Sequence, residues 1–310
     1  MGKAMMRIGI DLGGTKTEGI LLDENGCQVA RFRVPTPRGD YPATLQTIAE
    51  MVRALEAEAG IRRASVGVGI PGIISPATGL VKNANSTWLI GKPLDHDLAD
   101  ALGRPVRVEN DANCLAVSEA ADGAGAGCGV VFAAILGTGC GAGIVIDGRP
   151  LSGRNAIGGE WGHNPLPWPT EAEGRGPACY CGKHGCLESY VSGPALAADH
   201  DAATGETLTT AEIAARAASG DAGCKATLDR LMDRLGRGLA TIVNVLDPDV
   251  IVLGGGLSNL DCLYDGLPPI IERWAFSDRI DTPIRRAAHG DSSGVRGAAW
   301  LWRPGEASDA

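Results

Sequence analysis

Short apolar runs separated by glycine-rich turns dominate the start of the chain. Residues 7–22 carry apolar side chains on both sides of the turn Gly13-Gly-Thr-Lys16, which is typical of a β-hairpin. The elements expected next are a strand at 28–34, a helix at 41–59 and a buried strand at 66–70. This order of strands and helix predicts a mixed α/β fold.

The hairpin pattern recurs further along the chain. Shifting the sequence by 124 positions, without a gap, aligns identical residues: Leu12, Gly13, Gly19, Ile20 and Asp23 fall on Leu136, Gly137, Gly143, Ile144 and Asp147. A strand is expected at 130–136, directly before the second turn. We therefore expect two related α/β lobes, each opening with a hairpin whose glycine turn lets backbone N–H groups approach a phosphate.

Beyond the second hairpin the pattern changes again. Residues 149–185 are loop-like, and residues 210–245 are helical with a long apolar stripe. A buried strand at 249–253 leads into Gly254-Gly255-Gly256 and a new helix, an order that favours nucleotide contact. A closing helix is expected at 294–302.

Length and composition bound the class of protein. A chain of 310 residues fits two domains, and we expect a smaller N-terminal lobe at 1–117, with 294–310 packing back on it, and a larger lobe at 118–293. The net charge of −9 argues against a nucleic-acid partner, which needs a concentrated basic face. No apolar run approaches the roughly 20 residues that cross a bilayer, and no targeting segment precedes the first strand. We expect a cytoplasmic protein that acts on a small molecule.

The first turn is rich in groups that suit phosphate. Gly13 and Gly14 remove side chains from the bend, and Thr15 and Lys16 offer hydrogen-bond donors. Asp11 ends the strand, where its carboxylate can join the shell of a magnesium ion. The alternative is a plain hairpin turn without a ligand.

The second turn, which contains Gly137, Thr138 and Gly139, favours phosphate over a plain turn in both lobes. Ile135 takes the place of Asp11 there, so only the first lobe carries the acidic group. A dinucleotide fingerprint would have to open a helix, whereas a strand pattern continues here at 144–146. A Walker phosphate loop is absent from the sequence, since no glycine motif ends in Gly-Lys-Ser/Thr.

The segment Glu109-Asn-Asp-Ala-Asn113 follows an expected strand at 106–108 and precedes an alanine-rich helical stretch. Strand ends in α/β folds face the ligand crevice, where an aspartate such as Asp111 can accept a proton from an attacking hydroxyl. The alternative is that Asn110 or Asp111 only caps the helix.

A third group combines cysteines and histidines. Cys179, Cys181 and Cys186 lie at spacings of two and five residues in a glycine-rich loop, a pattern typical of a zinc site. Three thiolates and one imidazole make a closed tetrahedral shell, which predicts a structural zinc ion. The fourth ligand is either His163 or His184, and the alternative to a metal is a turn with free thiols.

Six motifs, in this order, resemble the bacterial ROK family (repressors, open reading frames and kinases), and they span nearly the whole chain. They are D-L-G-G-T-K-T at 11–17, E-N-D-A-N at 109–113, G-T-G-C-G-A-G at 137–143, G-E-W-G-H at 159–163, C-Y-C-G-K-H-G-C-L-E at 179–188 and L-G-G-G at 253–256. The segments 83–88, 162–168 and 289–300 look most like the fructokinase (mannokinase-like) branch. The gap between His163 and Cys179, with Pro165, Pro167 and Pro169, is longer than in many glucokinases of the family.

The resemblance implies a two-lobed, actin-like and RNase-H-like ATPase fold and a homodimer. It implies ATP-dependent phosphorylation of a free hexose at its 6-hydroxyl, with Mg²⁺ on the nucleotide and a structural Zn²⁺. Fructose is the first expected acceptor, with mannose and glucose as further ones. N-acetylglucosamine and N-acetylmannosamine are the alternative acceptors. A sugar-responsive regulator is a further alternative, disfavoured because such regulators carry an added N-terminal DNA-binding region.

The resemblance also implies roles for individual residues. Asp111 is the expected base, and His163 is the expected fourth zinc ligand. The sugar contacts that the resemblance implies are Asn85, Asn110, Asp111, Glu160, His163 and Glu188. The expected ATP and phosphate contacts are Asp11, Gly13, Gly14, Thr15, Lys16, Gly137, Thr138, Gly139, Gly254, Gly255 and Gly256.

Overall fold

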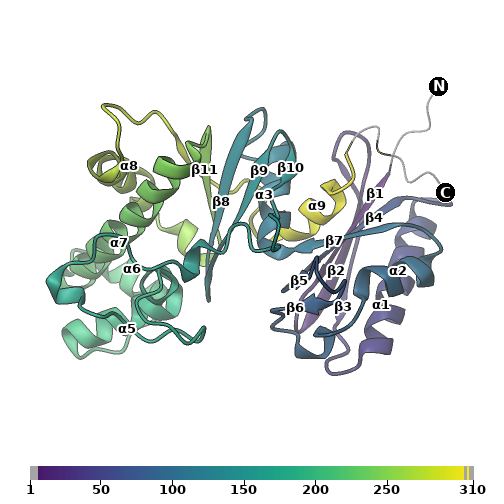
Figure 1. Cartoon of the computed structure of the whole chain (residues 1–310), viewed down its shortest axis with the longest axis horizontal. Helices are drawn as coiled ribbons and strands as arrows, with labels where there is room; N and C mark the ends of the chain where they lie inside the picture. The colour runs from purple at the N-terminus through teal and green to yellow at the C-terminus, as the bar shows by residue number, and fades with distance from the viewer. Residues whose placement is uncertain (1–5, 304–305, 307–310) are drawn as a thin grey trace. The chain divides into compact units, whose positions relative to one another are not determined.

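The computed structural model describes residues 6–303 and 306 of the chain (Figure 1). The chain divides into two compact units. The first unit comprises Met1–Gly127, Gly143–Gly158 and Ala288–Ala310, and the second comprises Cys128–Ala142 and Gly159–Ala287. Of the C-terminal stretch 294–310 that we expected to pack back on the first lobe, residues 304–305 and 307–310 lie outside the described part.

A five-stranded sheet has the order β3-β2-β1-β4-β7. Its strands are β1 (Arg7–Leu12), β2 (Lys16–Leu22), β3 (Gln28–Pro35), β4 (Ser65–Ile70) and β7 (Val106–Asn110). The strand β2 pairs antiparallel with both β1 and β3, whereas β4 pairs parallel with both β1 and β7. Two short strands, β5 (Ile73–Ile74) and β6 (Val81–Lys82), pair separately.

A second five-stranded sheet repeats this order as β10-β9-β8-β11-β12. Its strands are β8 (Val130–Leu136), β9 (Cys140–Ile146), β10 (Arg149–Pro150), β11 (Val250–Gly254) and β12 (Ile284–Arg286). The strand β10 pairs antiparallel with β9, whereas β11 pairs parallel with both β8 and β12. The strand ends at Leu12, Lys16 and Leu22 recur at Leu136, Cys140 and Ile146, the positions given by the repeat offset. The expected α/β fold with a duplicated hairpin is confirmed.

Helices in the first unit cover the sheet through small or apolar residues. They are α1 (Tyr41–Glu58), α2 (Leu94–Leu102), α3 (Asp111–Asp122) and α9 (Ser293–Trp300). Asp40 caps α1 by accepting a hydrogen bond from the Ala43 amide, and Ile48, Val52 and Leu55 of α1 are fully buried. The helix α9 lies so close to β4 that a Cβ atom on Gly67 would be 1.9 Å from the carbonyl oxygen of Ala298.

The labelled helices of the second unit lie on one side of the strands β8 and β11 in Figure 1. They are α4 (Glu188–Val191), α5 (Gly193–Thr204), α6 (Thr210–Ala218), α7 (Ala222–Leu246) and α8 (Cys262–Trp274). The helical stretch expected at 210–245 is two helices, because Gly220 takes a left-handed φ of 96° and Asp221 caps a new helix. Within the described part of the chain, every helix is too short or too polar to cross a membrane.

Candidate active site

The first glycine turn, which the sequence predicts to bind phosphate, joins β1 to β2 in the first unit. The Gly13 amide donates to the Lys16 carbonyl oxygen at 3.0 Å, which closes the hairpin. A Cβ atom at position 13 would be 2.8 Å from that oxygen, whereas one at Gly14 would be 3.8 Å from its nearest neighbour. Neither glycine has a left-handed φ. Gly13 is therefore required because the Lys16 carbonyl leaves no room for a side chain, whereas the space beside Gly14 is open.

Asp11 lies beside this turn, and the pKa of its carboxyl group is raised to about 6. Burial is the largest cause, followed by the negative charges of Asp111 and Glu18. Lys16 and Arg33 act in the opposite direction. A cation bound beside Asp11 would favour its ionised form, which suits the magnesium role expected for this residue.

Asn110 is the residue at the N-cap position of α3. Its side-chain oxygen accepts a hydrogen bond from the Ala112 amide at 2.9 Å, and its amide nitrogen donates to the Gly72 carbonyl at 3.3 Å. Asp111 is the exposed first residue of α3. Asn110 is therefore the N-cap residue of α3, and the carboxylate of Asp111 also accepts a hydrogen bond from the Ala112 amide, at 2.8 Å.

Glu109 is a residue that the sequence analysis did not assign to the site. Its carboxylate accepts hydrogen bonds from the Asn110 amide at 2.9 Å and from the Asn113 side chain at 3.0 Å. The Ser152 hydroxyl donates to the same carboxylate at 2.7 Å. Glu109 thus ties the end of β7 to the loop that follows β10, and its place in the motif at 109–113 was the available signal.

The predicted sugar contacts are divided between the units. Asn85, which is exposed, belongs to the first unit with Asn110 and Asp111, and its amide donates to the Pro71 carbonyl at 3.0 Å. Glu160 and Glu188 belong to the second unit. Glu160 is exposed and directly precedes the 3₁₀ turn η2 (Trp161–His163).

Glu188 lies against the second phosphate turn. Its carboxylate accepts a hydrogen bond from the Cys140 amide at 2.9 Å. A Cβ atom on Gly139 would be 2.7 Å from the same carboxylate, whereas one on Gly137 would have no neighbour within 4 Å. The Glu188 carboxylate therefore packs directly against the turn, at a position where only glycine leaves room for it.

The second unit contains a cavity of about 830 Å³ that borders this turn. Three of the predicted phosphate contacts line it, namely Gly137, Thr138 and Gly256, whereas Gly254 and Gly255 are not among its lining residues. The remaining lining residues are Gly193, Pro194, Ala197, Thr209, Thr210, Ala211, Ala214, Leu257, Asn259 and Leu260. The cavity has the size of a small-molecule site.

Two helices begin at this cavity. Gly193 and Pro194 open α5, and Thr210 opens α6 after the capping residue Thr209. Helix N-termini present backbone N–H groups and a partial positive charge, so both ends favour an anionic ligand. The wall between them also carries alanine and leucine side chains, which suits the apolar faces of a nucleotide base.

The expected zinc ligands lie together in the second unit. One ligand atom each from His163, Cys179, Cys181 and Cys186 lies within 4.8 Å of the others. The Nδ1 atom of His163 is 3.6 Å from the Cys179 sulfur, and the Cys181 and Cys186 sulfurs are 3.6 Å apart. These separations and the donor set fit a tetrahedral shell with Zn–S bonds of about 2.3 Å. His184 turns away, since its Nδ1 atom is 3.4 Å from the Gly176 carbonyl oxygen.

Backbone pairing explains how His163 reaches Cys179, which lies sixteen positions further along the chain. Pro165 and Cys186 form an antiparallel bridge, and the Leu187 amide donates to the Asn164 carbonyl at 2.9 Å. The Nε2 atom of His163 is 3.0 Å from the Tyr180 hydroxyl.

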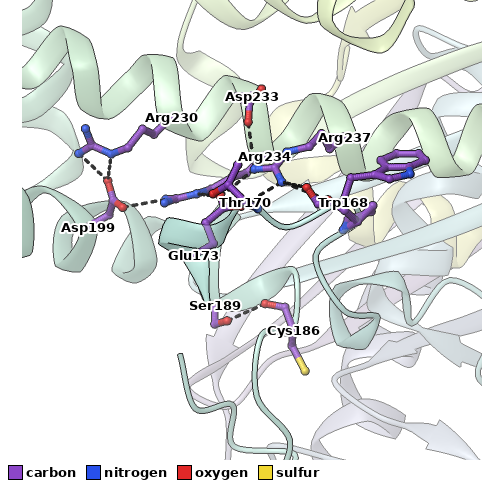
Figure 2. A network of polar contacts seen from close by, with 11 residues as sticks. Trp168, Thr170, Glu173, Cys186, Ser189, Asp199, Arg230, Asp233, Arg234 and Arg237 are labelled. Atoms are coloured by element: carbon purple, nitrogen blue, oxygen red, sulfur yellow. Dashed lines mark hydrogen bonds and ion pairs between the residues drawn. The ribbon is translucent and has the colours of Figure 1, made fainter. Parts of the chain in front are cut away.

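A row of arginines on α7 holds the long loop between His163 and Cys179. Figure 2 shows Arg230, Arg234 and Arg237 along this helix, with Asp199 and Glu173 between them. Arg237 donates to the Glu173 carboxylate at 2.7 Å and to the Trp168 carbonyl at 2.8 Å. The loop that leads to the expected zinc ligands is therefore held at its middle by a buried ionic network.

The chain belongs to the ROK family, whose family model matches residues 7–304. It is 40% identical over 300 residues to an N-acetyl-D-glucosamine kinase of Yersinia pseudotuberculosis serotype O:1b (strain IP 31758), covering 96% of this chain and 98% of that one. A ROK hexokinase from Thermus thermophilus superposes with a TM-score of 0.85 at 34% identity, covering 96% of this chain and 97% of that chain. A ROK family glucokinase from Streptomyces griseus, solved with glucose and AMPPNP, superposes with a TM-score of 0.75 at 30% identity, covering 96% and 98%.

These comparisons confirm the actin-like fold expected from the motifs. They do not favour the fructokinase branch that the segments at 83–88, 162–168 and 289–300 suggested. Relatives in Pectobacterium atrosepticum and Vibrio cholerae, each 40% identical to this chain and matched over 98% and 99% of their length, are also named N-acetyl-D-glucosamine kinases. The alternative acceptor class named from the sequence is therefore better supported than fructose.

Proposed function

We propose that this protein is an ATP-dependent kinase that phosphorylates the 6-hydroxyl of N-acetyl-D-glucosamine. The observation that carries the proposal is the 40% identity, over 96% of the chain, to a kinase named for that sugar. Fructose, which the sequence motifs suggested first, is the second candidate acceptor, and mannose and glucose follow it.

The second unit would bind the nucleotide. Its cavity is lined by Gly137 and Thr138 of the second turn and is bordered by the N-termini of α5 and α6. Backbone N–H groups at such positions stabilise phosphate charge, which is the main task of a protein in phosphoryl transfer. The turn of the first unit would contribute the Gly14 amide, Lys16 and the carboxylate of Asp11, with Mg²⁺ supplied with the nucleotide.

The first unit would supply the base. Asp111 would accept the proton of the attacking sugar hydroxyl, and Asn110 and Glu109 fix the turn on which it stands. Asn85 and Asn110 from the first unit, and Glu160, His163 and Glu188 from the second, would bind the sugar hydroxyls.

The residues of the zinc group would hold one Zn²⁺. Three thiolates and one imidazole complete its shell, so the ion would stabilise the loop that carries Glu188 and would leave no open position for catalysis. The Arg237–Glu173 contact holds the preceding part of the chain, between His163 and Cys179.

Asp111→Asn tests the base, because the change keeps the size of the side chain and removes its basicity. We expect turnover, measured by coupled ADP release, to fall by roughly 10²–10⁴-fold while sugar binding by calorimetry is retained. The matched control is Asp100→Asn, whose side chain is 74% exposed on α2. An Asp111→Asn enzyme with more than a tenth of wild-type turnover would overturn the assignment.

A further inference from the structure

Thr36, directly after β3, contacts the phosphate turn of the first unit twice. It is only 6% exposed. Its hydroxyl donates to the Gly13 carbonyl oxygen at 2.8 Å, and its backbone N–H donates to the Thr15 carbonyl oxygen at 3.0 Å. We propose that Thr36 is a positioning residue that orients the amides of this turn toward phosphate, an inference that rests on the proposed nucleotide role of the turn.

The hydrogen bonds around Thr36 run in one direction. A threonine hydroxyl has a single hydrogen, and that of Thr36 is directed to the Gly13 carbonyl, which can only accept. The Thr17 hydroxyl is 2.9 Å from the Thr36 hydroxyl and must therefore be the donor of that pair. Because Thr17 is fully buried, this relay holds the Thr36 side chain in one orientation.

Because the contacts with Thr36 fix the directions of two carbonyl groups in the turn, they also fix the directions of the amides in the same peptides. The peptide bonds of the described chain are trans, so the C=O and N–H of each peptide point in opposite directions. Since the Gly13 carbonyl faces Thr36, the Gly14 N–H faces away from it. The Thr15 carbonyl also faces Thr36, and the Lys16 N–H accordingly points away. A flipped Gly13–Gly14 peptide would direct a carbonyl oxygen, instead of a donor, at the phosphate.

The second turn holds the same peptide by other means. The repeat offset places Gly137 in the position of Gly13. The Gly137 carbonyl accepts a hydrogen bond at 2.8 Å from the Gly193 amide, the first residue of α5. One turn thus uses a side-chain donor and the other a backbone donor for the equivalent carbonyl. Because both turns fix the carbonyl at this position, we infer that the direction of this peptide matters for function.

Thr36→Val removes the hydroxyl and keeps both the shape and the backbone N–H. Calorimetry with MgATP is the probe, because it does not depend on which sugar is used. We expect Thr36→Val to weaken MgATP binding at least tenfold and Thr36→Ser to restore it to within about threefold. Thr44→Val is the matched control: Thr44 is a fully buried threonine of α1 whose hydroxyl bonds to the Asp40 and Pro37 carbonyls and to the Trp88 indole, and not to the turn at 13–16.

The outcomes separate the inference from the proposed function. Wild-type affinity in Thr36→Val, equal losses in Thr36→Val and Thr44→Val, or failure of Thr36→Ser to restore binding would each overturn the role of Thr36. None of these results would affect the kinase assignment, provided that the wild type binds MgATP. A wild-type protein that does not bind MgATP would overturn both.

Discussion

Glu173 in the loop before the zinc ligands offers a stability prediction that can be worked from the structure. Burial raises the pKa of its carboxyl group, but hydrogen bonds from Arg237, the Thr170 amide and Arg234 outweigh that effect and lower the pKa to about 2 from an ordinary 4.5. The side chain is 8% exposed, and that of Arg237 is 1% exposed. The charged form is therefore strongly favoured in the folded protein.

The size of the effect follows from linkage. Lowering the pKa from 4.5 to about 2 on folding corresponds to roughly 3 kcal/mol of folding free energy at pH 7. Because the folded pKa is depressed, this stabilisation is present above pH 4.5 and is lost as the pH falls toward 2. At pH 4 roughly three quarters of it would remain. We expect Glu173→Gln to unfold more easily by about 3 kcal/mol at pH 7, in the range for removing one partner of a buried ion pair.

Urea unfolding at pH 7 and pH 4, followed by tryptophan fluorescence, measures both quantities. Trp168 and Trp274 stack at 5.0 Å beside this network and report on it. The control is Glu206→Gln, which removes a surface pair with Arg216 and should cost less than about 1 kcal/mol. The reasoning is refuted if Glu173→Gln matches the wild type at pH 7, or if the difference between them is no smaller at pH 4.

Two further predictions concern the loop and the second turn. Elemental analysis of purified protein should find about one zinc atom per chain. Cys179→Ser should lose the zinc, whereas Cys262→Ser, at an exposed cysteine outside the group, should keep it. Active wild-type enzyme without zinc would contradict the structural role. Gly139→Ala should lower the melting temperature by several degrees, because its Cβ atom would lie 2.7 Å from the Glu188 carboxylate, whereas Gly137→Ala meets no neighbour within 4 Å and should melt as the wild type does. Equal melting temperatures for these two variants would show that Glu188 moves freely.

Local patterns in the sequence predicted the hairpins and their repetition well. The offset of 124 residues required only short-range information, since each hairpin is made by neighbouring strands. The shared strand order of the two sheets then follows, because a duplicated unit folds to the same topology. The break between α6 and α7 was missed, since the Gly220-Asp221 pair interrupts an apolar stripe that continues on both sides.

Contacts between distant segments were beyond the reach of sequence patterns. Glu173 and Arg237 are 64 positions apart, and Gly13 and Thr36 are 23 apart, with no spacing rule that links either pair. The cavity at the start of α5 and α6 was missed for the same reason, since its wall is made of common small residues. Acceptor preference was also beyond the reach of the motifs, because the motifs that define the family report on the shared chemistry of phosphoryl transfer and not on the group at sugar C2.

Coupled ADP release with a panel of sugars tests the central claim most directly. The panel contains N-acetylglucosamine, N-acetylmannosamine, fructose, mannose and glucose, each assayed for kcat/KM with MgATP. The account predicts sugar-dependent ADP release with the highest kcat/KM for N-acetylglucosamine. A higher kcat/KM for fructose would contradict the acceptor assignment, and the absence of sugar-dependent ADP release across the panel would contradict the assignment as a sugar kinase.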